Sequence, residues 1–336
     1  MDSQEWIKSQ RKELPITLTA DECRGKTYIV TGATSGLGLE CTKHLVRLEC
    51  AHVVIAVRNL KRGEVVKASI ENKTGRLGVI HVWHLDLASF DSVTAFAKRA
   101  EAELERVDGV VANAGVANGY WIETAGMESN LTVNVLGNLL FVVLMFPILR
   151  KSAVNFTMTP CITITGTMGA FSTLQCLQKF DRDNIFNDLN TRKRWEPDID
   201  ARYVFSKLLL HFATRQIAAI APVKRTGVVV NIVNPGLCKT NLQSNVRLPM
   251  RIIALIMKLL IGRTAEVGSR TLLHGIASGA ESHGKYLSDC QIREEEVPEW
   301  ISNEDGMICQ GKVWAQITEK LESIQQGCIK AVLHDV

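Results

Sequence analysis

The sequence has few of the features that mark disulfide-rich, metal-binding or nucleic-acid-binding proteins. Its nine cysteines form no Cys-x-x-Cys pair and no tight cluster, which is typical of reduced thiols in an intracellular, cytoplasmic protein. The histidines are scattered, and His81 and His84 would point to opposite faces of a strand, so we expect no metal site. The net charge of +4 is small and dispersed, which argues against nucleic acid as a partner. The start, MDSQEWIKSQRKELP, lacks the apolar core of a signal peptide.

Long apolar runs without interruption are also missing. One strongly apolar stretch, residues 131–149, is interrupted by Asn134, Asn138 and Pro147. A span needs about 20 predominantly apolar residues, and the buried helices of globular proteins can have the same composition. We therefore expect a core helix here.

A second apolar stretch, residues 248–262, carries Arg251 and Lys258 and is too short to span a membrane. We interpret it as part of a lid, at about residues 241–264, over an apolar site. A helix that makes weak contact with a membrane surface is the alternative.

From Gly25 onward, short apolar strands alternate with longer helices, which predicts a parallel sheet covered by helices on both faces. The strands are expected at 27–32, 52–58, 79–87, 109–115, 162–166, 227–236 and 285–290, and the helices at 37–48, 62–72, 90–104, 131–150, 203–219 and 265–277. No repeat or linker marks a second domain. The predicted fold class is α/β, a doubly wound parallel sheet in a single domain at 25–336, with an N-terminal extension at 1–24 and a C-terminal extension after 290.

The turn TGATSGLG lies between the first strand and the first helix of this pattern. Gly32 permits the tight turn, Gly36 lets the backbone approach a pyrophosphate, and Gly38 permits close packing of helix on strand. The helix N-terminus that follows offers free N–H groups to phosphates. The position of the turn, after a strand and before a helix, favours a dinucleotide site over an ordinary glycine-rich turn.

Tyr203 and Lys207 are four residues apart in ARYVFSK, so on a helix they project from the same face. A phenol with a pKa near 10 exchanges protons poorly at neutral pH, and a nearby ammonium lowers that pKa. The spacing alone is common, and its significance here comes from the other motifs.

Together, the glycine-rich turn and the Tyr203–Lys207 pair resemble the short-chain dehydrogenase/reductase family over roughly residues 25–290. The resemblance implies a Rossmann-type fold and a small-molecule oxidoreductase that is often a homo-oligomer. It implies catalytic roles for Tyr203 as proton donor and acceptor and for Lys207, which tunes the phenol and bonds the nicotinamide ribose. It also implies a water-holding role for Asn134, with Asn138 as the weaker candidate.

The same resemblance assigns a cofactor site along the strand ends. Asp86 would bond the adenine amino group, the Asn113–Gly115 element would back the adenine ribose, and Pro235–Gly236 with Thr240 would lie beside the nicotinamide. The full set of expected cofactor-binding residues is Gly32, Ser35, Gly36, Leu37, Gly38, Arg58, Asp86, Leu87, Asn113, Ala114, Gly115, Tyr203, Lys207, Pro235, Gly236 and Thr240.

The end of the second strand indicates which cofactor is bound. An enzyme that uses NAD places a carboxylate there against the ribose hydroxyls. This chain has Val57–Arg58 instead, and an arginine suits a 2′-phosphate. We therefore predict NADP(H), although Arg58 could also be a plain surface arginine.

The sequence departs from the family pattern at one catalytic position. Thr167 replaces the serine expected to polarise the substrate oxygen; it keeps the hydroxyl and adds a methyl group that crowds the pocket. The stretch from Thr167 to Tyr203 is longer than usual for the family and could shape the substrate entrance or only decorate the surface.

The first functional hypothesis is an NADP(H)-dependent reductase or dehydrogenase for a bulky hydrophobic small molecule. The strand end at Arg58, VNVLGN and KYLSDC resemble the retinol-dehydrogenase-like branch, whose fungal members often act on polyketide or terpenoid intermediates of secondary metabolism. An isomerase, cyclase or dehydratase without net redox chemistry is the alternative. A nucleotide-sensing binding protein is a third, which the intact Tyr203, Lys207 and Asn134 disfavour.

Overall fold

The computed structural model describes residues 3–196 and 198–333. Within this part of the chain, one sheet has the strand order β10-β9-β8-β7-β4-β1-β2-β3, and a separate small hairpin pairs β5 with β6. Neighbouring strands of the large sheet are parallel except for β9 and β10, which are antiparallel at the edge. The strands are β1 (Thr27–Thr31), β2 (His52–Val57), β3 (Ile80–His84), β4 (Gly109–Ala112), β5 (Glu123–Thr124), β6 (Met127–Glu128), β7 (Cys161–Thr165), β8 (Val229–Asn234), β9 (Tyr286–Ser288) and β10 (Gln291–Ile292).

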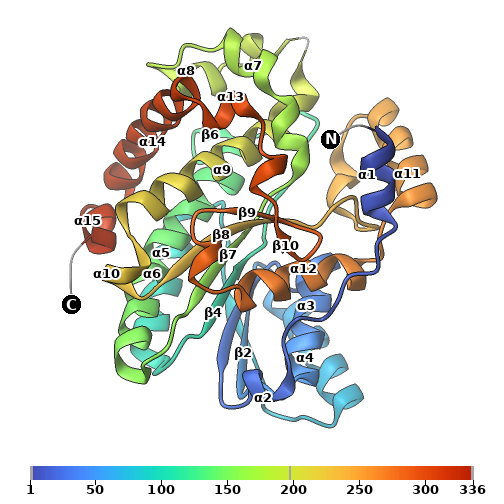
Figure 1. The fold of residues 1–336 in the computed structure, drawn as a ribbon, viewed down its shortest axis with the longest axis vertical. Helices are drawn as coiled ribbons and strands as arrows, with labels where there is room; N and C mark the ends of the chain where they lie inside the picture. Colours follow the sequence, from blue (N-terminus) through green and yellow to red (C-terminus); the bar gives the residue numbers. More distant parts are fainter. Residues whose placement is uncertain (1–2, 197, 334–336) are drawn as a thin grey trace.

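The strands of this sheet are buried on both faces because helices cover each face, and successive side chains of a strand enter opposite cores. Ile29 and Val54 belong to one hydrophobic core, whereas the adjacent Val30 and Ile55 belong to the other. Helices α5, α6 and α9 build the first core, and α3, α4 and α12 build the second. The helices are α3 (Gly36–Arg47), α4 (Leu60–Thr74), α5 (Phe90–Glu103), α6 (Asn138–Phe156), α9 (Arg202–Ile220), α10 (Val223–Thr226) and α12 (Ala265–Ala277). The doubly wound α/β fold predicted from the sequence is confirmed (Figure 1).

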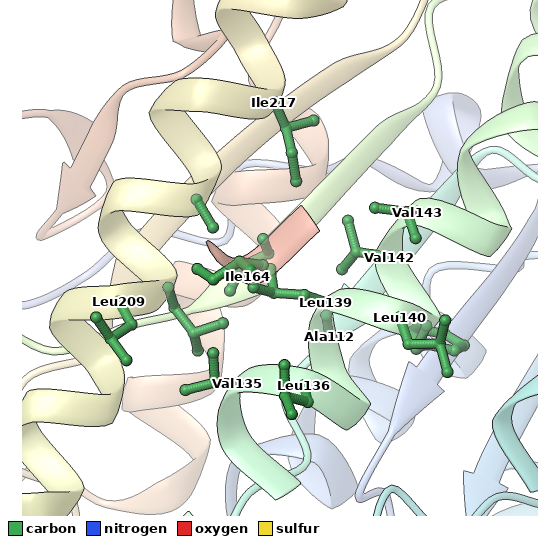
Figure 2. Close-up of a cluster of buried hydrophobic side chains, with 14 of the residues drawn as sticks. Ala112, Val135, Leu136, Leu139, Leu140, Val142, Val143, Ile164, Leu209 and Ile217 are labelled. Atoms are coloured by element: carbon green, nitrogen blue, oxygen red, sulfur yellow. The ribbon is translucent and has the colours of Figure 1, made fainter. Parts of the chain in front are cut away.

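The apolar stretch at 131–149 is a core helix, as predicted. It begins as a π-helix, Leu131–Gly137, and continues as α6. Among the described residues, Leu131–Phe156 is the one helix long and apolar enough to cross a membrane, but 83% of its most apolar window is buried inside the protein. Figure 2 shows Val135, Leu136 and Leu139 directed into the cluster that α9 and the sheet complete.

The N-terminal residues form two short helices, α1 (Ser3–Gln10) and α2 (Ala20–Cys23). Ser9 and Gln10 at the end of α1 are buried, and so are Leu14 and Leu18 in the connection that follows. This segment therefore contributes side chains to the interior of the protein.

The expected lid contains the helix α11 (Leu248–Ile261), which follows a short 3₁₀ helix at Leu242–Asn245. Many of its large apolar side chains are exposed, including Leu259 at 66% and Leu260 at 72%. The helix lies at the right-hand edge of the fold, away from the sheet (Figure 1).

The long stretch between Thr167 and Tyr203 is folded. It contains α7 (Leu174–Lys179) and α8 (Ile185–Leu189), together with 3₁₀ turns at Met168–Ser172, Arg192–Trp195 and Ile199–Ala201. The ring of Phe180 lies 4.9 Å from that of Trp195 and 5.3 Å from that of Phe205 in α9. These edge-to-face contacts attach the segment to the helix that carries Tyr203.

The C-terminal residues form α13 (Glu299–Ser302), α14 (Glu304–Ile324) and α15 (Cys328–Leu333) after a 3₁₀ turn at Glu294–Glu296; another such turn, Ala280–Ser282, precedes β9. Helix α14 packs on α9, and α15 packs on α6. Ile317 and Leu321 of α14 are fully buried. The C-terminal helices thus cover the outer faces of two helices that flank the sheet.

Candidate active site

A cleft of about 770 Å³ opens at the carboxyl ends of the parallel strands. In a doubly wound sheet this edge is where ligands bind, because the strand order reverses there. All of the residues predicted for the site line this cleft except Gly38 and Asn134, which lie directly behind its wall. The cleft is therefore the candidate active site.

The turn after β1 is built for close contact with a ligand. Gly32 and Gly36 have φ values of 68° and 57°, a region in which a side chain would be strained. A Cβ atom at Gly38 would lie 2.7 Å from the carbonyl oxygen of Gly32, so only glycine lets α3 pack against this turn. Ser35 at the N-cap of α3 makes no side-chain capping bond. The first N–H groups of α3 are therefore available to an anion in the cleft.

Thr31, at the end of β1, fixes the neighbouring end of β4. Its Oγ1 accepts hydrogen bonds from the N–H groups of Asn113, at 2.9 Å, and Ala114, at 2.8 Å. The Asn113 side-chain amide returns a bond to the Thr31 carbonyl oxygen at 3.0 Å. The Asn113–Gly115 element predicted from the sequence is thus held as part of the cleft floor.

The end of β2 brings two arginines to the cleft. Arg58 is exposed there, and Arg62, in the first turn of α4, lines the same wall. Asn59 caps α4 by accepting a bond from the Arg62 N–H at 3.0 Å. Arg62 was missed by sequence reasoning, although its spacing of four from Arg58 across a helix start could have indicated it. Asp86 lies at the next strand end, where its Oδ1 accepts from the Ala88 N–H at 3.0 Å.

Tyr203 and Lys207 lie on the cleft side of α9, one helical turn apart. Lys207 Nζ is 6.0 Å from the centre of the Tyr203 ring and donates to the Thr165 carbonyl oxygen at 2.7 Å. Burial lowers the pKa of Lys207 to about 8. It raises the pKa of Tyr203 to about 12, with a smaller contribution from Cys238.

The direction of the Tyr203 shift differs from the sequence prediction. The spacing predicted that Lys207 would lower the pKa of the phenol, but desolvation of the phenol dominates in the structure. The ammonium is directed to the Thr165 carbonyl oxygen. In this state the Tyr203 hydroxyl is protonated at neutral pH.

Asn134 lies behind Tyr203 and Lys207, in the π-helix that precedes α6. Its side chain pairs with the Val116 backbone, accepting from N–H at 2.8 Å and donating to the carbonyl oxygen at 2.9 Å. It also donates to Ser206 Oγ at 2.9 Å, and Ser206 donates to the Tyr203 carbonyl oxygen at 2.6 Å. Asn134 therefore ties the loop after β4 to α9. The Asn138 side chain donates to the Ala114 carbonyl oxygen at the longer distance of 3.5 Å.

Thr167 follows β7 and caps the short 3₁₀ helix after it. Its Oγ1 accepts from the Gly169 N–H at 3.2 Å, and the residue lines the cleft with Tyr203. Asn234, at the end of β8, accepts from the N–H groups of Met168 at 3.3 Å and Gly236 at 3.1 Å. Asn234 was missed because its partners lie on two separate loops, and it joins the Thr167 and Pro235–Gly236 segments.

Lys258 connects helix α11 to the cleft. Its Nζ donates to the Thr240 carbonyl oxygen at 2.9 Å, and burial lowers its pKa. Thr240 lies close to the glycine turn. A Cβ atom added at Gly36 would be only 3.2 Å from Thr240 Cγ2. The sequence predicted a lid at this place but did not identify Lys258 as a lining residue.

Comparison with known proteins gives the family. Residues 26–155 match the family model of short chain dehydrogenases. Short chain dehydrogenase/reductase dmxR8 of Cryptosporiopsis sp. (strain 8999) is 38% identical over 304 residues, which are 90% of this chain and 92% of that protein. Short-chain dehydrogenase anuD of Penicillium roqueforti (strain FM164) is 34% identical over 308 residues, 90% of this chain and 79% of that protein.

Solved structures share the fold. The 3-ketoacyl-(acyl-carrier-protein) reductase from Brucella melitensis, complexed with NADH, has a TM-score of 0.58 at 18% identity and covers 79% of this chain and 96% of its own. A short-chain dehydrogenase from Sphingobium yanoikuyae, in complex with NADPH, has a TM-score of 0.56 at 18% identity, with 78% and 86% covered. Because the curated relatives share about a third or more of their residues over 90% of the chain, the chain belongs to the short-chain dehydrogenase/reductase family of oxidoreductases.

Proposed function

We propose that the protein interconverts a carbonyl and an alcohol on a bulky hydrophobic small molecule with NADP(H), such as a polyketide or terpenoid intermediate. The observation that carries the proposal is the position of Tyr203 and Lys207, in the same cleft as the glycine turn before α3. A proton donor and a dinucleotide cradle are the two parts that carbonyl reduction needs.

The residues present fit a dinucleotide. Close-packed glycines and the uncapped N-terminus of α3 leave room and N–H donors for a pyrophosphate. Asp86 and the Asn113–Gly115 element would hold the adenosine half, and Pro235–Gly236 and Thr240 the nicotinamide half. When bound, the nicotinamide supplies or accepts the hydride.

A preference for NADP(H) over NAD(H) is supported by the end of β2. Arg58 and Arg62 both line the cleft there, and no carboxylate follows Val57 in VRNL. Two guanidinium groups suit a 2′-phosphate, whereas the ribose hydroxyls of NAD(H) favour a carboxylate partner.

The residues of this chain supply the proton that reduction needs. The Tyr203 hydroxyl, whose pKa is raised to about 12, keeps its proton at neutral pH and can pass it to the more basic alkoxide oxygen that develops during reduction. Thr167 Oγ1 would orient that oxygen from the adjacent wall of the cleft. Lys207 bonds to the Thr165 carbonyl oxygen, and Asn134 bonds to the Val116 backbone. These bonds keep the strand ends around Tyr203 in place.

The alternative is an isomerase, cyclase or dehydratase that uses Tyr203 without net redox chemistry. Thr167, which replaces the family serine, and the long stretch between Thr167 and Tyr203 motivate it. The Thr167 Oγ1 accepts a bond from the Gly169 N–H and keeps its own O–H free to donate, so it can hold a substrate oxygen in either reaction.

The test is a titration of the purified protein with NADPH and NADH, followed by assays with a panel of hydrophobic ketones and aldehydes. Tighter binding of NADPH and loss of its absorbance with at least one carbonyl compound are expected. Conversion of a substrate without consumption of NADPH would support the alternative. Binding of neither nucleotide would contradict both the cofactor assignment and the redox proposal.

A further inference from the structure

The N-terminal helix α1 is anchored to the C-terminal part of the fold by a buried polar network. Ser9 Oγ donates to one carboxylate oxygen of Asp289 at 2.8 Å, and Arg263 Nη2 donates to the other at 2.6 Å. Arg263 Nη2 also donates to the Ser9 carbonyl oxygen at 2.6 Å. The side chains of Arg263 and Asp289 are 1% and 3% exposed, so the network is protected from water and the end of α1 is fixed.

The same helix end supports a wall of the cleft. Gln10 Oε1 accepts from the Leu237 N–H at 3.0 Å, and Arg263 Nη1 donates to the Pro235 carbonyl oxygen at 3.1 Å. A Cβ atom at Gly236, whose φ is 76°, would lie 2.7 Å from Gln10 Nε2. Pro235, Gly236 and Leu237 all line the cleft, so α1 is packed directly behind this wall.

Trp6 extends that wall into the cleft. It lies four residues before Gln10, so the two side chains project from the same face of α1. Trp6 itself lines the cleft and is half-buried. An indole in a ligand-binding wall offers a large, rigid apolar surface at small entropic cost.

The sheet topology places Trp6 away from the adenine half of the site. Arg58 and Asp86 follow β2 and β3, whereas α1 is attached to the segment after β8, and the order β8-β7-β4-β1-β2-β3 separates them across the sheet. On the β8 side the cleft is also lined by the apolar side chains of Met168, Leu237 and Leu242.

Building on the proposed function, we propose that Trp6 is a specificity-determining residue at the substrate end of the cleft. The substrate of the protein is then a flat, apolar carbonyl compound that contains a ring. One face of the ring packs on the indole, and the carbonyl oxygen contacts the Tyr203 hydroxyl. The N-terminal helix is thus part of the substrate site, held by Ser9 and Gln10.

The experiment compares α-tetralone with cyclohexanone, because the two ketones differ by one fused benzene ring. Four full-length proteins are assayed with NADPH: wild type, Trp6→Ala, Trp6→Phe and the control Ile7→Ala. The control removes an apolar side chain next to Trp6 on the same helix. Binding of α-tetralone to NADP⁺-loaded protein is measured by calorimetry in parallel. Thermal unfolding of each variant verifies that it is folded.

For Trp6→Ala we expect kcat/KM for α-tetralone to fall about tenfold, mainly through KM, and that for cyclohexanone to change less than about threefold. Trp6→Phe should recover most of the loss, and Ile7→Ala should resemble wild type. The inference is overturned if Trp6→Ala leaves the ratio of kcat/KM for the two ketones unchanged, whether both values stay the same or both fall equally. It is also overturned if wild type reduces cyclohexanone but does not bind α-tetralone.

The proposed function fails in a different way. If none of the carbonyl compounds tested causes wild type to oxidise NADPH, the redox assignment is wrong. Calorimetry then still decides the role of Trp6: binding of α-tetralone that Trp6→Ala weakens about tenfold supports it, and binding that the substitution leaves unchanged, or no binding at all, refutes it.

Discussion

Arg202, the residue directly before Tyr203, forms a buried ion pair with Glu128, whose Oε1 lies 2.8 Å from Arg202 Nη1. The two side chains are 1% and 3% exposed. Arg202 also donates to the carbonyl oxygens of Asn118, at 3.0 Å, and Ile199, at 2.8 Å. The start of α9, and with it Tyr203, is therefore fixed to β6 and to the loop after β4 by charge-assisted bonds in a dry environment.

Replacing Arg202 by methionine should be strongly destabilising, because it leaves the Glu128 carboxylate buried without its cation. We expect the free energy of unfolding to fall by about 3–5 kcal/mol, measured by urea denaturation. The double variant Arg202→Met/Glu128→Gln should recover part of the loss. A loss below about 1 kcal/mol in the single variant would mean that the pair is solvated in solution.

Tyr203→Phe removes the proposed proton donor and keeps the ring. We expect kcat for carbonyl reduction to fall by about 10²- to 10⁴-fold, with the affinity for NADPH nearly unchanged. Tyr120→Phe is the matched control, since Tyr120 is 58% exposed and does not line the cleft. Wild-type turnover in Tyr203→Phe would refute the acid/base assignment.

Arg58→Ala should separate the two nicotinamide cofactors. If the guanidinium holds a 2′-phosphate, the Kd for NADPH should rise about tenfold or more, whereas the Kd for NADH should stay within about twofold. Lys61→Ala, on the same helix start but outside the cleft lining, controls for a general loss of positive charge. Equal weakening of both cofactors by Arg58→Ala would argue against the phosphate contact.

Lys207 should make stability depend on pH in a defined direction. Its pKa is lowered to about 8 in the folded protein, against about 10.4 in an unfolded chain. Between these values the unfolded chain binds the extra proton, so the Lys207 contribution to the free energy of unfolding rises with pH, by at most about 1.4 kcal/mol per unit. Below pH 8 the cost of burying the ammonium is fully present.

Buried thiols act in the opposite direction over the same range, because burial raises the pKa of Cys161 and Cys238 to about 12, so the unfolded chain loses protons first. The informative quantity is therefore the difference between wild type and Lys207→Met. Urea unfolding at pH 7.5 and pH 9.5, values chosen about the folded pKa, should show Lys207→Met gaining less stability, or losing more, than wild type. Parallel behaviour of the two proteins would contradict the buried-ammonium interpretation.

Leu321→Ala tests the packing of α14 on α9. Leu321 is fully buried, and its truncation should cost about 2–5 kcal/mol of unfolding free energy. Leu260→Ala makes the same chemical change in α11 at a side chain that is 72% exposed, and it should change stability by less than about 0.5 kcal/mol. Similar effects of the two substitutions would show that α14 is not firmly packed in solution.

The parts of the site that could be predicted are those set by local backbone requirements. Gly32, Gly36 and Gly38 were identified because a turn, a close approach and helix packing each exclude a side chain. The structure shows the tight turn at Gly32 and the helix packing at Gly38. The approach of a pyrophosphate to Gly36 stays a prediction. Strand ends were predictable for a similar reason, since alternating strands and helices bring all carboxyl ends to one edge.

The parts that were missed depend on contacts between residues far apart in sequence. Ser9 bonds to Asp289 across 280 positions, and nothing in the polar start of the chain indicates that Trp6 reaches the cleft. Asn234 and Lys258 contact loops whose course the sequence does not determine. The Tyr203 pKa was misjudged because the spacing to Lys207 shows proximity, whereas the shift depends on burial.

The packing of the C-terminal helices restricts how two copies of the chain could associate. Helix α15 packs on α6 and helix α14 packs on α9, and apolar side chains of all four helices belong to one core cluster. A second copy could contact these faces of α6 and α9 only if α15 and α14 of each chain moved away. The quaternary structure, measured by light scattering, should therefore depend on other surfaces and should be unaffected by charged substitutions along the outer side of α14.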